Sequence, residues 1–68
     1  MELKEKRLAL VMMQSRLNGS RVAALAAARE LDNPPTAEQL TNLTDALVML
    51  TYDCDAMVGL AQAFMEDD

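Results

Sequence analysis

The side chains that could do chemistry in this sequence are few, and the densest group is the tripeptide Asp53-Cys54-Asp55. A thiol flanked by two carboxylates has residue types found in metal sites and nucleophilic sites. Neighbouring residues of a helix point in different directions, however, so these three cannot converge on one ion. Histidine is absent, and Cys54 falls within an apolar stripe, where a thiol is expected to be buried, protonated and inert. We therefore expect no catalytic residue, no metal, no cofactor and no enzymatic activity.

The composition predicts an all-α protein with a thin core. A chain of 68 residues makes one domain at most, spanning residues 1–68, and a domain of this size buries proportionally little of its surface. Hydrophobic residues make up 51%, yet Tyr52 and Phe64 are the only aromatics. The apolar content is therefore Leu, Ala, Met and Val, which suits helices better than sheets.

The segment ELDNPPTAEQL contains a helix stop followed by a helix start. Two consecutive prolines cannot continue a helix, and Asn33 before them is disfavoured in the helical region. Thr36 is a good N-cap, and Gln39 three residues later completes a capping box. The sequence thus predicts a helix over about residues 3–31, a turn over 32–36 and a helix over about 37–65, paired as an antiparallel two-helix hairpin.

The second helix carries an apolar stripe with alternating steps of three and four residues, typical of a coiled-coil seam. We expect this stripe to face the first helix. Its members are Leu40, Leu43, Leu47, Leu50, Cys54, Met57, Ala61 and Phe64.

The pair Asn18-Gly19 poses the main question for the first helix, because it is a strong turn signal. The heptad pattern nevertheless passes through it in phase, with Leu3, Leu10, Leu17, Ala24 and Leu31 at one position and Met13, Ser20 and Ala27 at the other. The cost of Asn and Gly in a helix, about 1.5 kcal/mol relative to Ala, can be offset by packing. We favour one helix; the alternative ends a helix at Leu17 and restarts it with Ser20 as N-cap.

Charge is divided between the two halves of the chain. All six bases lie in the first 29 residues, and nine acids without a base follow from Glu30 onward. A hairpin would place these charges against each other, with Arg16 near Asp55 and the bases Lys4, Lys6 and Arg7 near the acidic end 66–68. Because this pairing leaves no uncompensated basic stripe, nucleic acid is not expected as a partner.

Localisation follows from the cysteine count and the apolar runs. Cys54 cannot form an internal disulfide, and the chain opens without the pattern of a secretory leader. The longest apolar runs, residues 8–13 and 22–28, are far shorter than the roughly 20 residues of a membrane span. We expect a cytoplasmic protein that does not enter a membrane.

More apolar residues are present than one helix-helix seam uses, which predicts an interface with another molecule. The hairpin is therefore expected to be completed by self-association or by a helical partner. The residues expected to form this partner interface are Leu8, Val11, Val22, Leu25, Met49 and Tyr52.

The order of features along the chain resembles the small co-chaperones of type III secretion needle subunits. The likeness rests on a polar start, a charged end to the first helix at residues 29–32, a short turn, the helix start Thr36-Ala37-Glu38-Gln39-Leu40, and an apolar second helix with an acidic end. The Pro34-Pro35 turn departs from the family. The resemblance implies a hairpin that binds a tetratricopeptide-like chaperone, the pair keeping a needle subunit unpolymerised in the cytoplasm.

The same length and two-helix plan also resemble the plasmid copy-number regulators of the Rop type, which are homodimeric four-helix bundles. In that family a basic, polar face contacts RNA, whereas the first helix here carries Leu8, Val11, Val22 and Leu25 on its outer surface. This resemblance implies a homodimeric regulator of phage or plasmid type, without the RNA-binding role.

Overall fold

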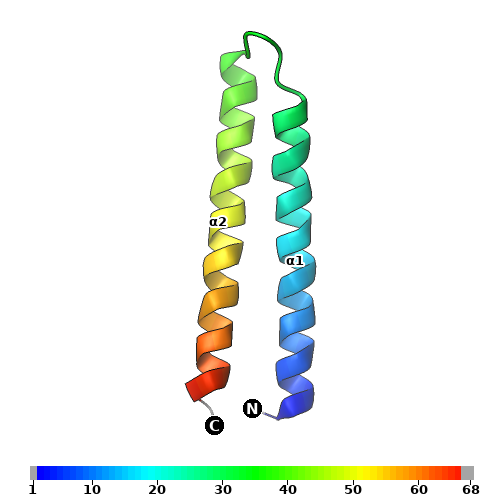
Figure 1. Ribbon diagram of the computed structural model, residues 1–68, viewed down its shortest axis with the longest axis vertical. Helices are drawn as coiled ribbons and strands as arrows, with labels where there is room; N and C mark the ends of the chain where they lie inside the picture. The colour runs from blue at the N-terminus through cyan, green and yellow to red at the C-terminus, as the bar shows by residue number, and fades with distance from the viewer. Residues whose placement is uncertain (1, 67–68) are drawn as a thin grey trace.

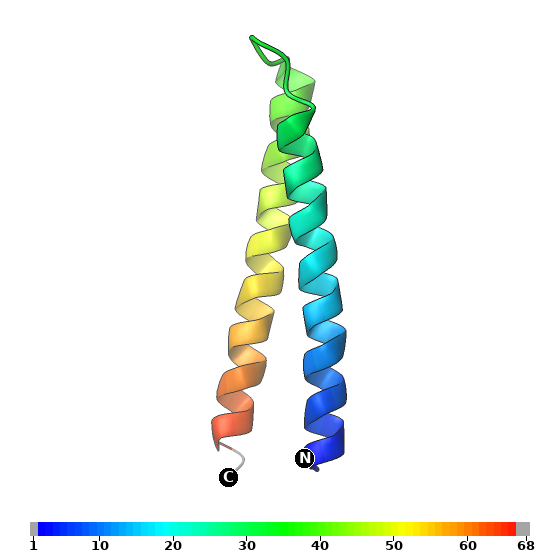
Figure 2. The same ribbon diagram turned by 45° about the vertical axis from the view of Figure 1, so that its right-hand side comes forward.

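Two long antiparallel helices make up the fold. The computed structural model describes residues 2–66, with helix α1 over Leu3–Arg29 and helix α2 over Ala37–Glu66. The helices lie side by side along their whole length, joined by one short turn, in a rod with principal extents of 51 × 16 × 12 Å (Figure 1). They cross at a shallow angle and separate toward the chain ends (Figure 2). The predicted all-α hairpin is confirmed.

Helix α1 runs without a break through Asn18 and Gly19. No residue within the described range has a positive φ, and a Cβ added at Gly19 would meet no atom within 4 Å. The alternative with a helix end at Leu17 is therefore wrong. Gly19 neither turns the chain nor contacts α2 closely, so continuous packing of the helix on both sides of the glycine outweighs the local turn preference.

The turn between the helices is organised by Gln39. Its side-chain Oε1 accepts hydrogen bonds from the backbone N–H of Thr36 at 3.0 Å and of Asp32 at 3.1 Å. In return the Gln39 N–H donates to Thr36 Oγ1 at 3.1 Å, which completes the predicted capping box. The Gln39 Nε2 also donates to the Glu30 carbonyl and the Asp32 carboxylate, at 2.9 and 3.1 Å. The Gln39 side chain thus caps α2 and links it to the residues that follow α1. Helix α1 itself ends at Arg29, two residues before the expected Leu31.

Replacing Gln39 by alanine is expected to lower the free energy of unfolding by about 1–2 kcal/mol, since the cap and the link across the turn are lost together. Urea unfolding followed by circular dichroism measures this change. Gln62→Ala, at an exposed position late in α2, is the matched control and should change stability by less than about 0.5 kcal/mol. Equal effects of the two substitutions would contradict a structural role for the Gln39 hydrogen bonds.

The face of α1 that contacts α2 agrees with the predicted seam except at the chain end. Leu3 is 64% exposed and Leu10 lies at the exposed edge of the contact. The less exposed residues of α1 lie on this side, and Leu31, which follows the end of the helix, continues their spacing. They are Lys6, Ala9, Met13, Leu17, Ser20, Ala24, Ala27 and Leu31. Near the open end, Lys6 Nζ lies 5.8 Å from the centre of the Phe64 ring, within cation-π range.

Only half of the residues in the predicted seam of α2 are turned toward α1. Four members of the predicted stripe take part, namely Leu43, Leu50, Met57 and Phe64. The other four, Leu40, Leu47, Cys54 and Ala61, are exposed, and the residue before each of them is turned inward instead: Gln39, Ala46, Asp53 and Leu60. Helix α2 is therefore rotated about its axis by roughly 50°, half of the step between successive residues, relative to the expected packing.

The core between the helices is small. Ala24, 6% exposed, is the single buried apolar residue among residues 2–66, and the one other buried residue is Asp53. Fourteen large apolar side chains in the same range are exposed. The apolar surface of this hairpin is consequently far larger than the two helices cover for each other.

Candidate interaction surface

The tripeptide Asp53-Cys54-Asp55 does not form one site. Asp53 is turned into the helix contact, whereas Cys54 and Asp55 are exposed. The expectation of a buried Cys54 is wrong, because the rotation of α2 moves its thiol from the seam to the flank of the hairpin. Within residues 2–66, no group of three His, Cys, Asp or Glu side chains is placed to hold a metal ion.

Asp53 is instead the centre of a polar contact between the helices. The Ser20 hydroxyl donates to its Oδ2, and Arg16 Nε lies 3.1 Å from its Oδ1. The Asp53 side chain is 3% exposed, whereas that of Arg16 is 67% exposed and reaches the carboxylate from the edge of the contact. Both carboxylate oxygens thus have a partner, as a buried charge requires.

The expected pairing of Arg16 with Asp55 is wrong, because the partner of Arg16 is Asp53, two positions earlier. The signal that could have found Asp53 is Ser20, a polar residue within the otherwise apolar stripe of α1. A buried hydroxyl needs a hydrogen-bonding partner, and Asp53 is the acid that the hairpin brings to the height of Ser20. This contact fixes both the register of the helices and the rotation of α2.

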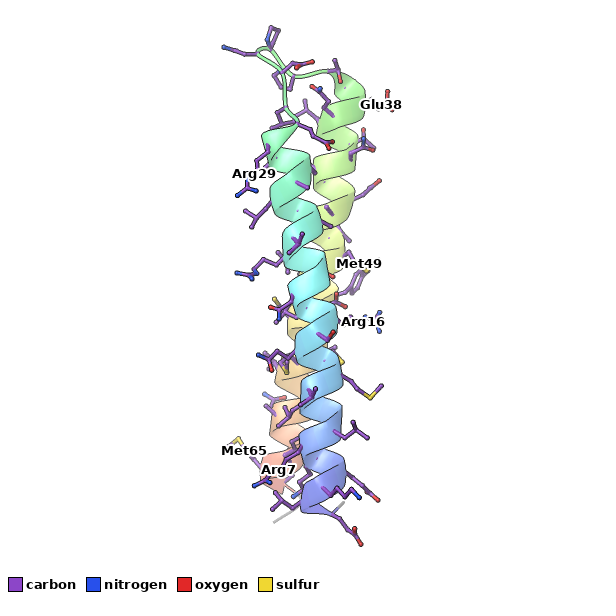
Figure 3. All side chains as sticks on the ribbon, turned by 90° about the vertical axis from the view of Figure 1, so that its right-hand side faces the viewer. Arg7, Arg16, Arg29, Glu38, Met49 and Met65 are labelled. Atoms are coloured by element: carbon purple, nitrogen blue, oxygen red, sulfur yellow. The ribbon has the colours of Figure 1, made fainter. Side chains whose placement is uncertain are left out.

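The six predicted interface residues are all exposed, but they do not form one patch. The four from α1, spaced by three and eleven residues, fall on the side of the helix that faces away from α2. Met49 of α2 projects from one broad face of the hairpin, on the same side as Arg16 (Figure 3). Tyr52, three positions after Met49, is the most exposed of the six, with 68% of its surface accessible. The structure thus leaves these residues accessible on two different helices.

The opposite broad face of the hairpin, which Figure 3 marks with Arg7 and Met65, carries a surface that the sequence pattern did not predict. Its first row is the four residues of the predicted stripe that do not contact α1. Its second row is the neighbouring line of residues on α2, spaced by seven and ending at Met65. We call this surface the leucine flank. Its residues are Leu40, Leu47, Cys54 and Ala61 in the first row and Thr44, Thr51, Val58 and Met65 in the second.

The leucine flank is apolar even where its residues carry hydroxyl groups. The Oγ1 of Thr44 donates to the Leu40 carbonyl and that of Thr51 to the Leu47 carbonyl, both at 2.9 Å. Because each hydroxyl already donates a hydrogen bond to its own helix, it needs no hydrogen-bond acceptor from a partner molecule. Thr44, Leu47 and Thr51 also line an open hollow of about 420 Å³, whose other lining residues are Val48, Tyr52 and Asp55.

The two helices carry opposite charges. Six bases and one acid give α1 a formal charge of +5, and five acids without a base give α2 a charge of −5. The hairpin therefore sets a positive helix beside a negative helix along its length. In a pair of hairpins whose helices alternate, helices of opposite charge are neighbours.

No protein-family model, curated protein or solved structure matches this chain. Neither helix, within residues 2–66, has a stretch long and apolar enough to cross a membrane.

Proposed function

We propose that this chain is a non-enzymatic protein-protein interaction module, a helical hairpin that another helical surface completes. The observation that carries the proposal is the imbalance between one buried apolar residue and fourteen exposed large apolar ones. Exposed apolar surface in this excess on a small protein indicates interaction surfaces. The exposed methionines, among them Met12, Met49 and Met65, add unbranched side chains that adapt to a partner.

The first role that we propose is that of a co-chaperone in the cytoplasm. In this role the outer face of α1 and the exposed Met49 and Tyr52 of α2 contact a tetratricopeptide-like chaperone, and the pair holds a type III secretion needle subunit unpolymerised. Support comes from the resemblance along the chain and from the exposure of the contact residues: Leu8, Val11, Val22, Leu25, Met49 and Tyr52.

Co-expression with a tetratricopeptide-type needle chaperone from the same organism tests this role. We expect the two proteins to co-purify, and we expect Val22→Asp to abolish the complex because a charge in an apolar contact is costly. Val58→Asp is the control, because Val58 is an exposed valine of α2 outside the six contact residues, and this substitution should leave the complex intact. Helicity measured for both variants separates loss of binding from loss of folding. Failure of the unmodified chain to bind any such chaperone would contradict the co-chaperone role.

The second role, a homodimeric four-helix-bundle regulator of phage or plasmid type, is favoured by a different observation. The opposite charges of α1 and α2 make the hairpin complementary to a second copy of itself. A two-helix hairpin of this length completed by its copy makes a four-helix bundle. Sedimentation equilibrium of the purified chain measures this directly, and a monomer at micromolar concentration would contradict the second role.

A further inference from the structure

We propose that a second copy of this chain docks on the leucine flank, with both turns at the same end of the dimer and α1 of each copy beside α2 of the other. This inference rests on the second proposed role and specifies the surface and the arrangement. Three features of the structure carry it: the nature of the flank, its area, and the charges of the two helices.

The first row of the leucine flank is apolar throughout, and the hydroxyl groups of the second row are bound to their own helix. Leu40 and Leu47 are each 47% exposed, so both side chains have apolar surface available to another helix. Residues of this kind sit at the centre of four-helix bundles, shared between pairs of helices. On the opposite face of the hairpin, the Arg16 guanidinium is bound to Asp53 at the border of the helix contact.

The face of the hairpin that contains the leucine flank is large enough for a stable dimer. Helix α2 has 30 residues and so extends about 45 Å, and two packed helices span about 20 Å, which gives this face, with the adjoining side of α1 included, about 900 Å². Stable interfaces bury about 800 Å² on each partner. A second copy that covers this face over its whole length therefore meets the requirement without any contribution from the outer face of α1.

The charges select between the two possible two-fold arrangements. With the turns at opposite ends, a two-fold axis across the bundle places α1 beside α1 and α2 beside α2, so that helices of equal charge are neighbours. With the turns at the same end, the axis runs along the bundle and every neighbouring pair joins the +5 helix to the −5 helix. Electrostatic complementarity favours the second arrangement.

Cross-linking can distinguish the two arrangements, because they differ in which residues of the two copies lie at the same position along the long axis of the bundle. Cys54 lies close to the middle of α2, so the two Cys54 thiols come near each other in either arrangement. Leu40 lies near the turn. With the turns at the same end, the two Leu40 positions are at equal height; with the turns at opposite ends they are about 35 Å apart along the bundle.

The test uses the full chain and a short bifunctional maleimide, with covalent dimers measured by mass. We expect the unmodified chain to cross-link through Cys54, and the variant Leu40→Cys with Cys54→Ser to cross-link as well. Asn42→Cys with Cys54→Ser is the matched control, since residue 42 lies at the same height but off the flank, and should give at least tenfold less dimer. Cross-linking through Cys54 without cross-linking through residue 40 would overturn the same-end arrangement.

Sedimentation equilibrium of a second pair of variants tests the surface independently. Leu47→Glu places a charge in the centre of the leucine flank and should raise the dissociation constant of the dimer at least tenfold. Leu8→Glu, on the outer face of α1, should leave the dissociation constant unchanged within threefold, with the helicity of both variants as the folding control. A dimer weakened by Leu8→Glu but not by Leu47→Glu would overturn the flank as the docking surface. In that case the chain still forms a dimer, but through another surface. This outcome is distinct from a monomeric unmodified chain, which would contradict the second role.

Discussion

Replacing Arg16 by methionine is expected to lower the free energy of unfolding by about 1–3 kcal/mol, although Arg16 is a largely exposed residue. Methionine retains most of the apolar stem and removes the charge, so that the buried Asp53 carboxylate keeps only its hydrogen bond from Ser20. Breaking a fully buried pair costs about 3–5 kcal/mol. Because water reaches the exposed guanidinium of Arg16 and screens the pair, we expect a smaller loss here.

Thermal and urea unfolding of Arg16→Met and Arg21→Met measure this effect. Arg21 is an exposed arginine of the same helix, so its replacement should change stability by less than about 0.5 kcal/mol. A double-mutant cycle sharpens the test: in an Asp53→Asn background, Arg16→Met should cost little, because the charge that it compensates is gone. If Arg16→Met is equally costly in both backgrounds, the ion pair with Asp53 is not the cause.

Enlarging Ala24 to leucine is expected to lower the free energy of unfolding by about 1–3 kcal/mol, because overpacking a well-packed position forces the surrounding backbone apart. Ala24 is the one apolar side chain that the helix contact buries within residues 2–66. Three additional carbon atoms at this position cannot be accommodated without moving α2 away from α1. Separation of the helices there would also strain the nearby contact between Ser20 and Asp53.

The control for this prediction is the preceding residue. Ala23 is exposed in the same helix, so Ala23→Leu introduces the same side chain without entering the contact. For a domain of this size a loss of 1 kcal/mol lowers the melting temperature by about 4–8 °C. We expect a shift of this order for Ala24→Leu and a much smaller one for Ala23→Leu. Equal melting temperatures of the two variants would show that the contact at Ala24 is loose.

The two proposed interactions use different surfaces of the hairpin. A second copy on the leucine flank leaves the outer face of α1, with Leu8 and Val22, accessible to a helical partner. A dimer could therefore present two copies of that face at once, and binding at two linked sites strengthens attachment without any new contact. In the proposed co-chaperone role, Met49 and Tyr52 are the residues of α2 that we propose to contact the partner.

Local signals in the sequence determined the elements of this fold. The prolines at 34 and 35 prevent the first helix from continuing through the turn, and Thr36 with Gln39 starts the second helix by hydrogen bonds within four residues. The heptad pattern likewise carried the first helix through Asn18-Gly19, because continuous periodicity over 27 residues outweighs one turn signal. Fold class, helix number and the position of the turn all followed from interactions between near neighbours in the chain.

Only the tertiary structure decided which face of α2 meets α1, and hence which surface is left for a partner. The sequence of α2 permits two stripes that share Leu43, Leu50 and Met57, one continued by Leu47 and Cys54 and the other by Ala46 and Asp53. Hydrophobicity favours the first stripe, and the structure has the second. The reason is that Ser20 and Arg16 supply hydrogen-bonding partners for Asp53 across the contact, and a polar group is buried where a partner for it exists. That partner lies 33 residues away in the chain, beyond the reach of any local pattern.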